Sequence, residues 1–232
     1  MFPIRDRLPT IRFPLVTIAL IAVNIMVFVL QMLVLGAGGE RALNQMVFTF
    51  GVVPARVAHD FGPLTWLTFV TSMFMHGGLM HIAGNMLYLW IFGNNVEDVM
   101  GPFWFTLFYF ACGFAASLAQ VFASWGSTVP GIGASGAIAG VLAAYLLFFP
   151  TARVETLIFF GYFARVRALP AVFVLGLWFV LQLFNGLLAF GVEQMGGVAW
   201  FAHIGGFVAG LVLALPWIGR ARRMGRRAWY RY

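Results

Sequence analysis

A glycine-rich turn that ends on a serine is the stretch best suited to chemistry. It covers residues 129–137, with the sequence VPGIGASGA, and leads into an apolar helix. Gly131 and Gly133 permit a positive φ, and Pro130 disfavours a helix arriving from before it, so Ser135 falls in a helical first turn. Unpaired N–H groups and the helix dipole there would stabilise an oxyanion bound at the serine. A plain serine N-cap fits this stretch equally well.

Two other segments carry histidine near the start of an apolar run. His81 and Asn85 are four residues apart and share a helical face, and His203 is the sole ionisable residue of its run. Polar side chains are costly at membrane depth, so these must face the protein or a wet cavity. Taken alone, His81 and Asn85 also fit a hydrogen-bonded packing patch, as Gln182 and Asn185 fit interhelical hydrogen bonds.

The composition predicts a protein with several membrane-spanning helices. Of 232 residues, 62% are hydrophobic and 9% charged, and the mean hydropathy is +0.93. A chain this apolar cannot cover itself with a polar surface in water. We expect an all-α bundle of six transmembrane helices, with an aromatic outer loop over residues 36–75 in the membrane interface. The apolar runs cover residues 14–35, 79–93, 103–124, 135–149, 169–190 and 198–218.

The distribution of charge along the chain predicts how the protein is oriented in the membrane. All 14 basic residues are arginine, and in a six-span topology 12 of them lie on one side, with Arg41 and Arg56 opposite. The positive-inside rule puts both termini in the cytoplasm. We therefore expect a cytoplasmic N-terminus (1–13), a six-helix membrane domain (14–218) and a basic cytoplasmic tail (219–232). The tail would lie on the anionic headgroups of the lipid bilayer, and the charge does not indicate binding to nucleic acid.

The depth of the polar residues links them. The helix that starts at Ser135 covers only about 22 Å of a hydrocarbon core of about 30 Å, so its start lies below the membrane surface. His81, Asn85 and His203 also lie early in helices that descend from the outer face. Nucleophile, base and oxyanion donors must converge on one carbonyl, which explains a shared depth. The pairs Gly136/Gly140 and Gly206/Gly210 would allow two of these helices to approach closely.

These motifs resemble those of the rhomboid intramembrane serine proteases. The matching residues are Gly133-Ala134-Ser135-Gly136, His81 with Asn85, and His203 with Gly206 and Gly210, in order along the whole chain. The resemblance implies a nucleophile, Ser135, and a general base, His203. It also implies an oxyanion site of His81, Asn85 and the Ser135 N–H, with His76 nearby. The substrates would be transmembrane proteins, cleaved in or near their transmembrane segments, and the location a prokaryotic inner membrane.

The residues themselves favour a dyad without a metal or cofactor. The outer-side acids Glu40, Asp60 and Glu193 all fall in loops, so none is evidently placed to orient His203 as a triad member. No His-Glu-x-x-His zinc motif occurs.

The chain departs from the family pattern at two positions. Leu67 follows Trp66 where many members have arginine, and Ala139 stands where some have an aromatic that packs on the histidine. These departures affect how the outer loop is anchored and how rigidly His203 is held. A rhomboid-like pseudoprotease that binds helices without cutting them is the alternative, although it would be expected to lack Ser135 or His203. A transporter would need more polar residues at the midplane.

Overall fold

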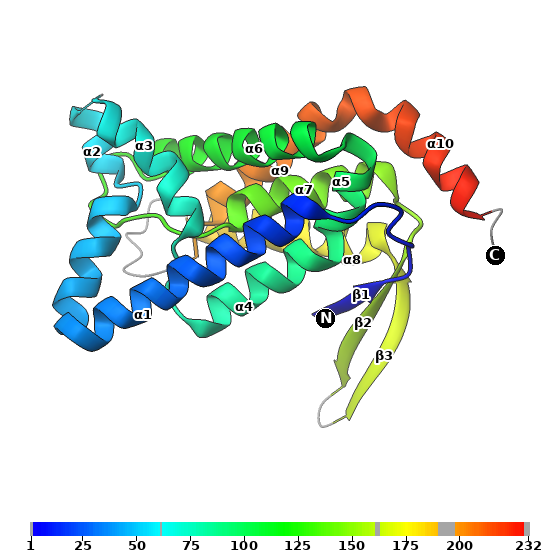
Figure 1. Cartoon of the computed structure of the whole chain (residues 1–232), viewed down its shortest axis with the longest axis horizontal. Helices are drawn as coiled ribbons and strands as arrows, with labels where there is room; N and C mark the ends of the chain where they lie inside the picture. The colour runs from blue at the N-terminus through cyan, green and yellow to red at the C-terminus, as the bar shows by residue number, and fades with distance from the viewer. Residues whose placement is uncertain (1, 61, 161–162, 190–197, 230–232) are drawn as a thin grey trace.

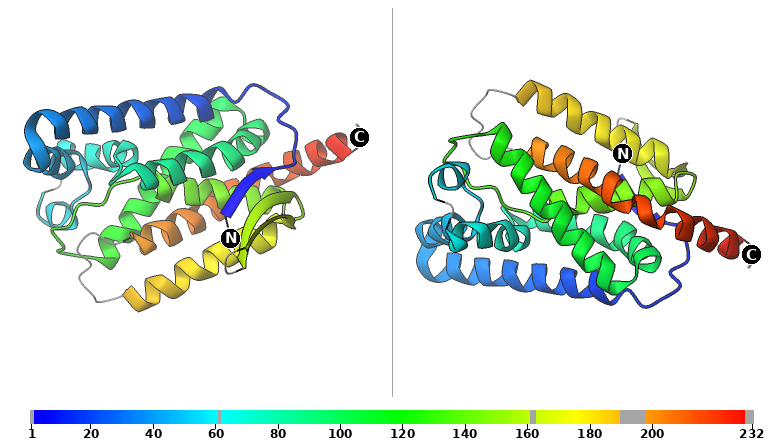
Figure 2. Two further views of the ribbon diagram at one scale, coloured as in Figure 1. Left: turned by 90° about the horizontal axis from the view of Figure 1, so that it is seen from below. Right: turned by 90° about the horizontal axis from the view of Figure 1, so that it is seen from above.

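The protein is an elongated bundle of helices with a small sheet at one end. The computed structural model describes residues 2–60, 62–160, 163–189 and 198–229. Helix α1 (Leu15–Phe50) lies at one side of the bundle and α8 (Ala171–Ala189) at the other, with α9 (Trp200–Ala214) between them (Figures 1 and 2). Helix α7 (Ser135–Phe148) is buried along most of its length, so the core surrounds it.

The predicted helical membrane protein is confirmed. Within the described ranges, four helices are long and apolar enough to cross a membrane: Leu15–Phe50, Pro102–Ala123, Ala171–Leu188 and Trp200–Met224. A fifth segment is α7, at 14 residues. The sixth is a continuous helical stretch made of α4 (Leu79–Tyr88), a π-helical segment η2 (Leu89–Gly93) and α5 (Asn94–Met100). These segments agree with the expected six crossings.

The outer segment between the first two spans is more helical than a loop. Helix α1 continues to Phe50, with non-helical geometry at Gly39, whose φ of 66° favours glycine. Helix α2 (Pro54–His59), α3 (Pro63–Thr71) and the 3₁₀ turn η1 (Ser72–Phe74) follow. Trp66 and Phe69 of α3 pack on Phe114 of α6 (Pro102–Ala123) with ring centroids 5.9 and 4.8 Å away. These aromatics therefore anchor the segment to the bundle.

Two acids of α5 hold the start of α1. The carboxylate of Glu97 accepts hydrogen bonds from the backbone N–H groups of Val16 and Thr17 at 2.9 and 2.8 Å. Asp98 accepts from the N–H groups of Ile11 and Arg12. Because the first N–H groups of a helix lack intrahelical partners, Glu97 supplies the cap that α1 does not provide itself, while Asp98 holds the chain just before the helix.

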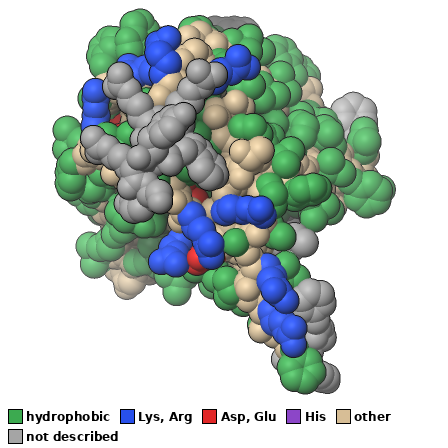
Figure 3. Space-filling view, turned by 90° about the vertical axis from the view of Figure 1, so that its right-hand side faces the viewer, with side chains coloured by type: hydrophobic (Ala, Val, Ile, Leu, Met, Phe, Trp, Pro, Cys, Tyr) green, Lys and Arg blue, Asp and Glu red, His purple; other side chains and the backbone are tan. Residues whose placement is uncertain are grey.

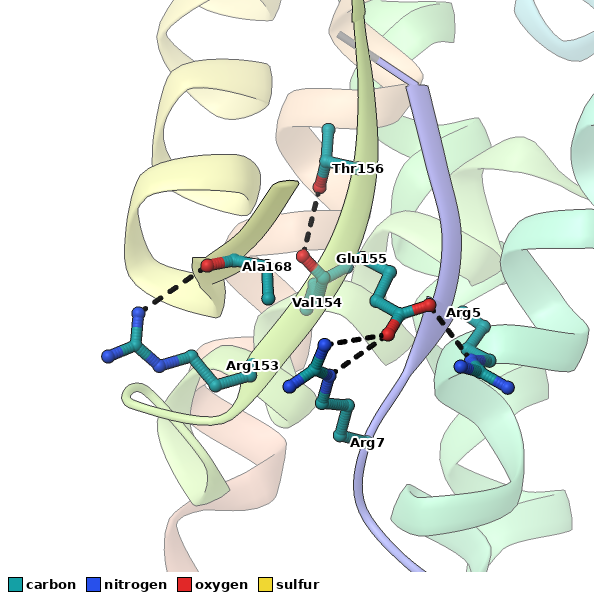
Figure 4. A network of polar contacts seen from close by, with 7 residues as sticks. All are labelled: Arg5, Arg7, Arg153, Val154, Glu155, Thr156 and Ala168. Carbon is teal, nitrogen blue, oxygen red and sulfur yellow. Dashed lines mark hydrogen bonds and ion pairs between the residues drawn. The ribbon is translucent and has the colours of Figure 1, made fainter. Parts of the chain in front are cut away.

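The fold is mostly helical, as expected, but the chain also forms a small sheet that the sequence analysis did not predict. Strands β1 (Phe2–Asp6), β2 (Arg153–Phe160) and β3 (Phe163–Pro170) are antiparallel in the order β1-β2-β3. Glu155 of β2 pairs with Arg5 and Arg7 at 3.0 and 2.9 Å (Figure 4). Val154 and Thr156 point the other way and are fully buried. Residues 153–160 are rich in β-branched and aromatic residues (Val154, Thr156, Ile158, Phe159 and Phe160), and this composition is the local signal for a strand.

The sheet lies at the same end of the molecule as α10 (Ile218–Trp229) (Figure 1). Viewed from this end, arginine side chains are spread over the bundle and the sheet (Figure 3). The opposite end carries α2 and α3 (Figure 1).

Candidate active site

The turn before Ser135 is held by backbone hydrogen bonds. Gly131 and Val52 exchange two of them, at 2.7 and 3.0 Å, and the Gly133 N–H donates to the Ser72 carbonyl at 2.9 Å. Gly133 has a φ of 128°, a conformation that other residues rarely adopt. The turn is therefore fixed to the outer segment, and it delivers Ser135 at the first residue of α7.

Ser135 and His203 are hydrogen-bonded to each other. The Ser135 Oγ lies 2.8 Å from His203 Nε2, although the two residues are 68 positions apart in the chain. His203 lies in the first turn of α9 and is 9% exposed. The structure thus brings together the two residues that the sequence analysis predicted to form a dyad.

Glycine pairs allow the two helices to come close enough for this contact. A Cβ added at Gly206 would collide with the backbone carbonyl of Gly136, and one at Gly210 would collide with that of Gly140. Only glycine fits where two backbones touch in this way. The close approach expected from the two pairs is present.

His203 has a second partner, Gln182, which the sequence analysis had assigned to an interhelical hydrogen bond without naming the residue that it binds. Its Nδ1 lies 2.7 Å from the Oε1 of Gln182 on α8, a side chain that is 7% exposed. Trp178, one turn earlier on α8, has its ring centroid 5.8 Å from that of the imidazole. Trp178 and Gln182 are four residues apart and share a helical face, and this spacing was the signal in the sequence that both could contact the same residue.

His81 lies beside the turn that carries Ser135. A Cβ on Gly133 would be 2.8 Å from His81 Nε2 and 3.7 Å from Ser135 Oγ, so all three residues adjoin one point. The N–H of Gly77 donates to His81 Nδ1 at 3.3 Å. In a neutral imidazole this leaves the proton on Nε2, the nitrogen that faces the turn.

Asn85 lies one turn after His81 on α4, and His76 precedes this helix. The Asn85 Nδ2 and both ring nitrogens of His76 are buried and have no hydrogen-bond partner among the described residues. The His76 ring packs edge-on against His81 with centroids 5.1 Å apart. Gln31 of α1 holds the His76 backbone through two hydrogen bonds, at 3.0 and 3.1 Å. A buried unpaired amide donor is costly, so Asn85 is a candidate to bind something that arrives.

A cavity reaches the serine from the outer end of the bundle. Its volume is about 440 Å³, and its wall includes Ser135, Gly133, Gln120, Ser124 and Trp200. Polar and apolar groups both line it, as expected where irregular backbone lies at membrane depth.

The described outer acids do not contribute to the site. Asp60 accepts hydrogen bonds from the Gly62 N–H and the Thr65 hydroxyl in the outer segment, and these bonds lower the pKa of its carboxyl. His203 takes its two side-chain partners from Ser135 and Gln182. Glu193 lies outside the described residues.

The fold and site define a helical membrane protein with a hydrogen-bonded serine–histidine pair where α7 and α9 begin. Residues 63–220 match the Rhomboid domain, a span that includes His81, Ser135 and His203. The chain belongs to the rhomboid family.

Its relatives include Rhomboid protease GluP of Bacillus subtilis (strain 168), 30% identical over 215 residues, which cover 92% of this chain and 37% of GluP. Rhomboid protease AarA of Providencia stuartii is 26% identical over 215 residues, 87% of this chain and 72% of AarA. Rhomboid-like protein 11, chloroplastic, of Arabidopsis thaliana is 29% identical over 168 residues, 70% of this chain and 56% of that protein. The chain thus spans little more than a third of the length of GluP.

Proposed function

We propose that this protein is an intramembrane serine endopeptidase that cleaves peptide bonds in or near transmembrane segments through Ser135 and His203. The observation that supports this most strongly is the 2.8 Å contact between Ser135 Oγ and His203 Nε2. An ordinary serine hydroxyl is a poor nucleophile, and an adjacent base able to take its proton makes it reactive. The names of GluP and AarA as rhomboid proteases agree with this activity.

The first half of the reaction acylates Ser135. Its Oγ attacks the carbonyl carbon of the substrate while His203 Nε2 takes the hydroxyl proton, giving a tetrahedral oxyanion. The imidazolium then gives that proton to the leaving amine nitrogen, and the C–N bond breaks. The product is an acyl ester on Ser135 and a free amine.

The second half releases the acyl group. A water molecule attacks the ester carbon as His203 Nε2 accepts its proton, and collapse of the second tetrahedral intermediate returns the proton to Ser135. The cavity of about 440 Å³ beside Ser135 offers space for this water and for substrate backbone.

The oxyanion would be bound by donors from two sides. The Ser135 N–H belongs to the first turn of α7, where no intrahelical acceptor exists. Asn85 Nδ2 has no partner among the described residues, and His81 Nε2 faces the same turn. Preorganised donors of this kind stabilise charge that develops only in the transition state.

The depth of the site suggests the substrate class. Helix α7 spans about 21 Å at 1.5 Å per residue, so its first residue lies inside a hydrocarbon core of about 30 Å. A peptide bond that reaches this depth belongs to a membrane protein whose transmembrane helix unwinds locally. The substrates we propose are therefore transmembrane proteins.

We also propose that both termini lie in the cytoplasm and that the membrane is a prokaryotic inner membrane. Arg5, Arg7 and Arg153 lie on the sheet, at the end that also carries α10 with Arg220 and Arg222. A concentration of arginine on one side is the usual mark of the cytoplasmic face. The basic tail would rest on anionic lipid headgroups.

Cleavage of a model single-span substrate in liposomes tests the function. We expect the wild-type protein to cut it and Ser135→Ala to abolish cutting, because the change removes the nucleophile and leaves the turn intact. Ser124→Ala is the matched control, since its hydroxyl also lies in the cavity wall but bonds the Gln120 carbonyl of its own helix at 2.7 Å. Folded wild-type protein that binds the substrate without cutting it would support the pseudoprotease instead.

A further inference from the structure

His203 is held at both ring nitrogens by side chains from two different helices. Ser135 on α7 meets Nε2 at 2.8 Å, and Gln182 on α8 meets Nδ1 at 2.7 Å. Both Gln182 and His203 are buried, at 7% and 9% exposure, so water does not compete freely for the second contact. The histidine therefore lies in the middle of a three-residue chain of hydrogen bonds.

The atom that Gln182 presents determines which nitrogen carries the proton. An amide oxygen only accepts, so the Nδ1 opposite Gln182 Oε1 must be the N–H of the neutral imidazole. The lone pair then lies on Nε2, facing the Ser135 hydroxyl. The reverse tautomer would place a proton on Nε2, and His203 could not accept the serine proton.

We propose that Gln182 is a positioning residue of the catalytic site, which fixes His203 in the tautomer and orientation needed to deprotonate Ser135. The contact between Gln182 and His203 does not depend on the proposed function, but its effect on catalysis rests on that function. It gives the site a third, uncharged member in the position where a serine triad has a carboxylate.

A second contact from α8 supports this role. Trp178 lies one turn before Gln182, and its ring is tilted 37° to the imidazole with centroids 5.8 Å apart. On α7, Ala139 lies one turn after Ser135 and carries only a methyl group. Helix α8 thus orients the imidazole at its edge through Gln182 and packs beside its ring through Trp178.

The tautomer can be measured without any enzymatic assay. The chain has four histidines, so a sample with ¹⁵N-labelled histidine gives few imidazole signals, and the His203 signal is identified by its loss in His203→Ala. At a pH where His203 is neutral, we expect the Nδ1–H tautomer in the wild type and a mixed or reversed population in Gln182→Met. Methionine has a similar length but no strong acceptor. An Nε2–H tautomer in the wild type, or an unchanged tautomer in the variant, would overturn the proposal.

Kinetics test the consequence of the tautomer. In Gln182→Met we expect kcat to fall by about 10–100-fold, as when the hydrogen-bond partner behind a metal-bound histidine is removed, with KM nearly unchanged. Asn185→Leu is the matched control, because Asn185 is an amide on the same helix that does not bond His203. Equal kcat for Gln182→Met and wild type would refute the role. A folded wild type with no activity would refute the proposed function, while the tautomer measurement would still decide on Gln182.

Discussion

Asn85 combines burial with an unused hydrogen-bond donor. It is 8% exposed, and its Nδ2 has no partner among the described residues. Leaving a buried donor unpaired costs about 1–3 kcal/mol, a cost that a structural role alone does not explain. In the proposed reaction, an oxyanion that forms only in the transition state would accept a hydrogen bond from this donor, and this bond would raise the rate.

Asn85→Ala should therefore slow the chemical step. We expect kcat to fall by about 10²–10³-fold with little change in KM, because an oxyanion donor acts mainly in the transition state. Steady-state cleavage of a single-span substrate by the reconstituted variant measures both constants. An unchanged kcat with a raised KM would make Asn85 a residue for substrate binding or packing.

The contact between the elements α7 and α9 determines whether the side chains of Ser135 and His203 meet. Gly206 lies directly on the carbonyl of Gly136, one residue after Ser135. Any side chain there would push the helices apart. Misplacement by about 1 Å can cost about 100-fold in rate even when the chemistry is untouched.

Gly206→Ala should lower both stability and activity. We expect a loss of about 1–3 kcal/mol in the free energy of unfolding, the usual cost of overpacking, together with a lower kcat. Gly176→Ala on α8 is the control, because a Cβ there has nothing within 4 Å and should raise stability slightly through helix propensity. Thermal unfolding in detergent compares the two, and equal stabilities would contradict the close packing.

The sheet is joined to the base of α7 through one partly buried carboxyl group, that of Asp6. Asp6 of β1 accepts hydrogen bonds from the Tyr145 hydroxyl at 2.8 Å and from Asn95 Nδ2 at 2.7 Å. Burial raises the pKa of Asp6 to about 6. Folding therefore favours its protonated form, so its contribution to stability is fully present below about pH 4 and is lost as the pH rises through about 6.

Asp6→Asn should remove this pH dependence. The amide keeps an oxygen that can accept both hydrogen bonds but carries no charge. Between pH 4 and pH 7, we expect the wild type to lose about 2–3 kcal/mol relative to the variant, as a shift of about two pKa units implies. Unfolding measured across this range tests the prediction, and parallel curves for the two proteins would contradict a raised pKa for Asp6.

At the scale of the whole molecule, hydropathy was sufficient to predict the spans but not the sheet. Six apolar runs predicted the bundle because hydrocarbon requires long apolar helices. The strands were missed because residues 153–170 were used only for their arginines, and because β1 pairs with a partner about 150 positions away. The outer segment was predicted as a loop, since prolines and glycines obscured the short helices α2 and α3.

The site was predictable where depth and spacing constrain it. Ser135, His203 and His81 share a layer because each lies at the start of an apolar run, and the structure brings them together. Gln182 lies in the middle of α8, where a lone amide fits any interhelical hydrogen bond. Only the packing of α8 against α9 reveals that its partner is His203.

The central claim is that Ser135 is a nucleophile activated by His203, and covalent labelling tests it most directly. Folded wild-type and His203→Ala proteins are treated with a fluorophosphonate, and mass spectrometry measures the stoichiometry at Ser135. We predict labelling of the wild type, which falls at acid pH as the imidazole becomes protonated, and none of His203→Ala, because the serine has lost its base. Equal labelling of Ser135 in the two proteins would contradict the account.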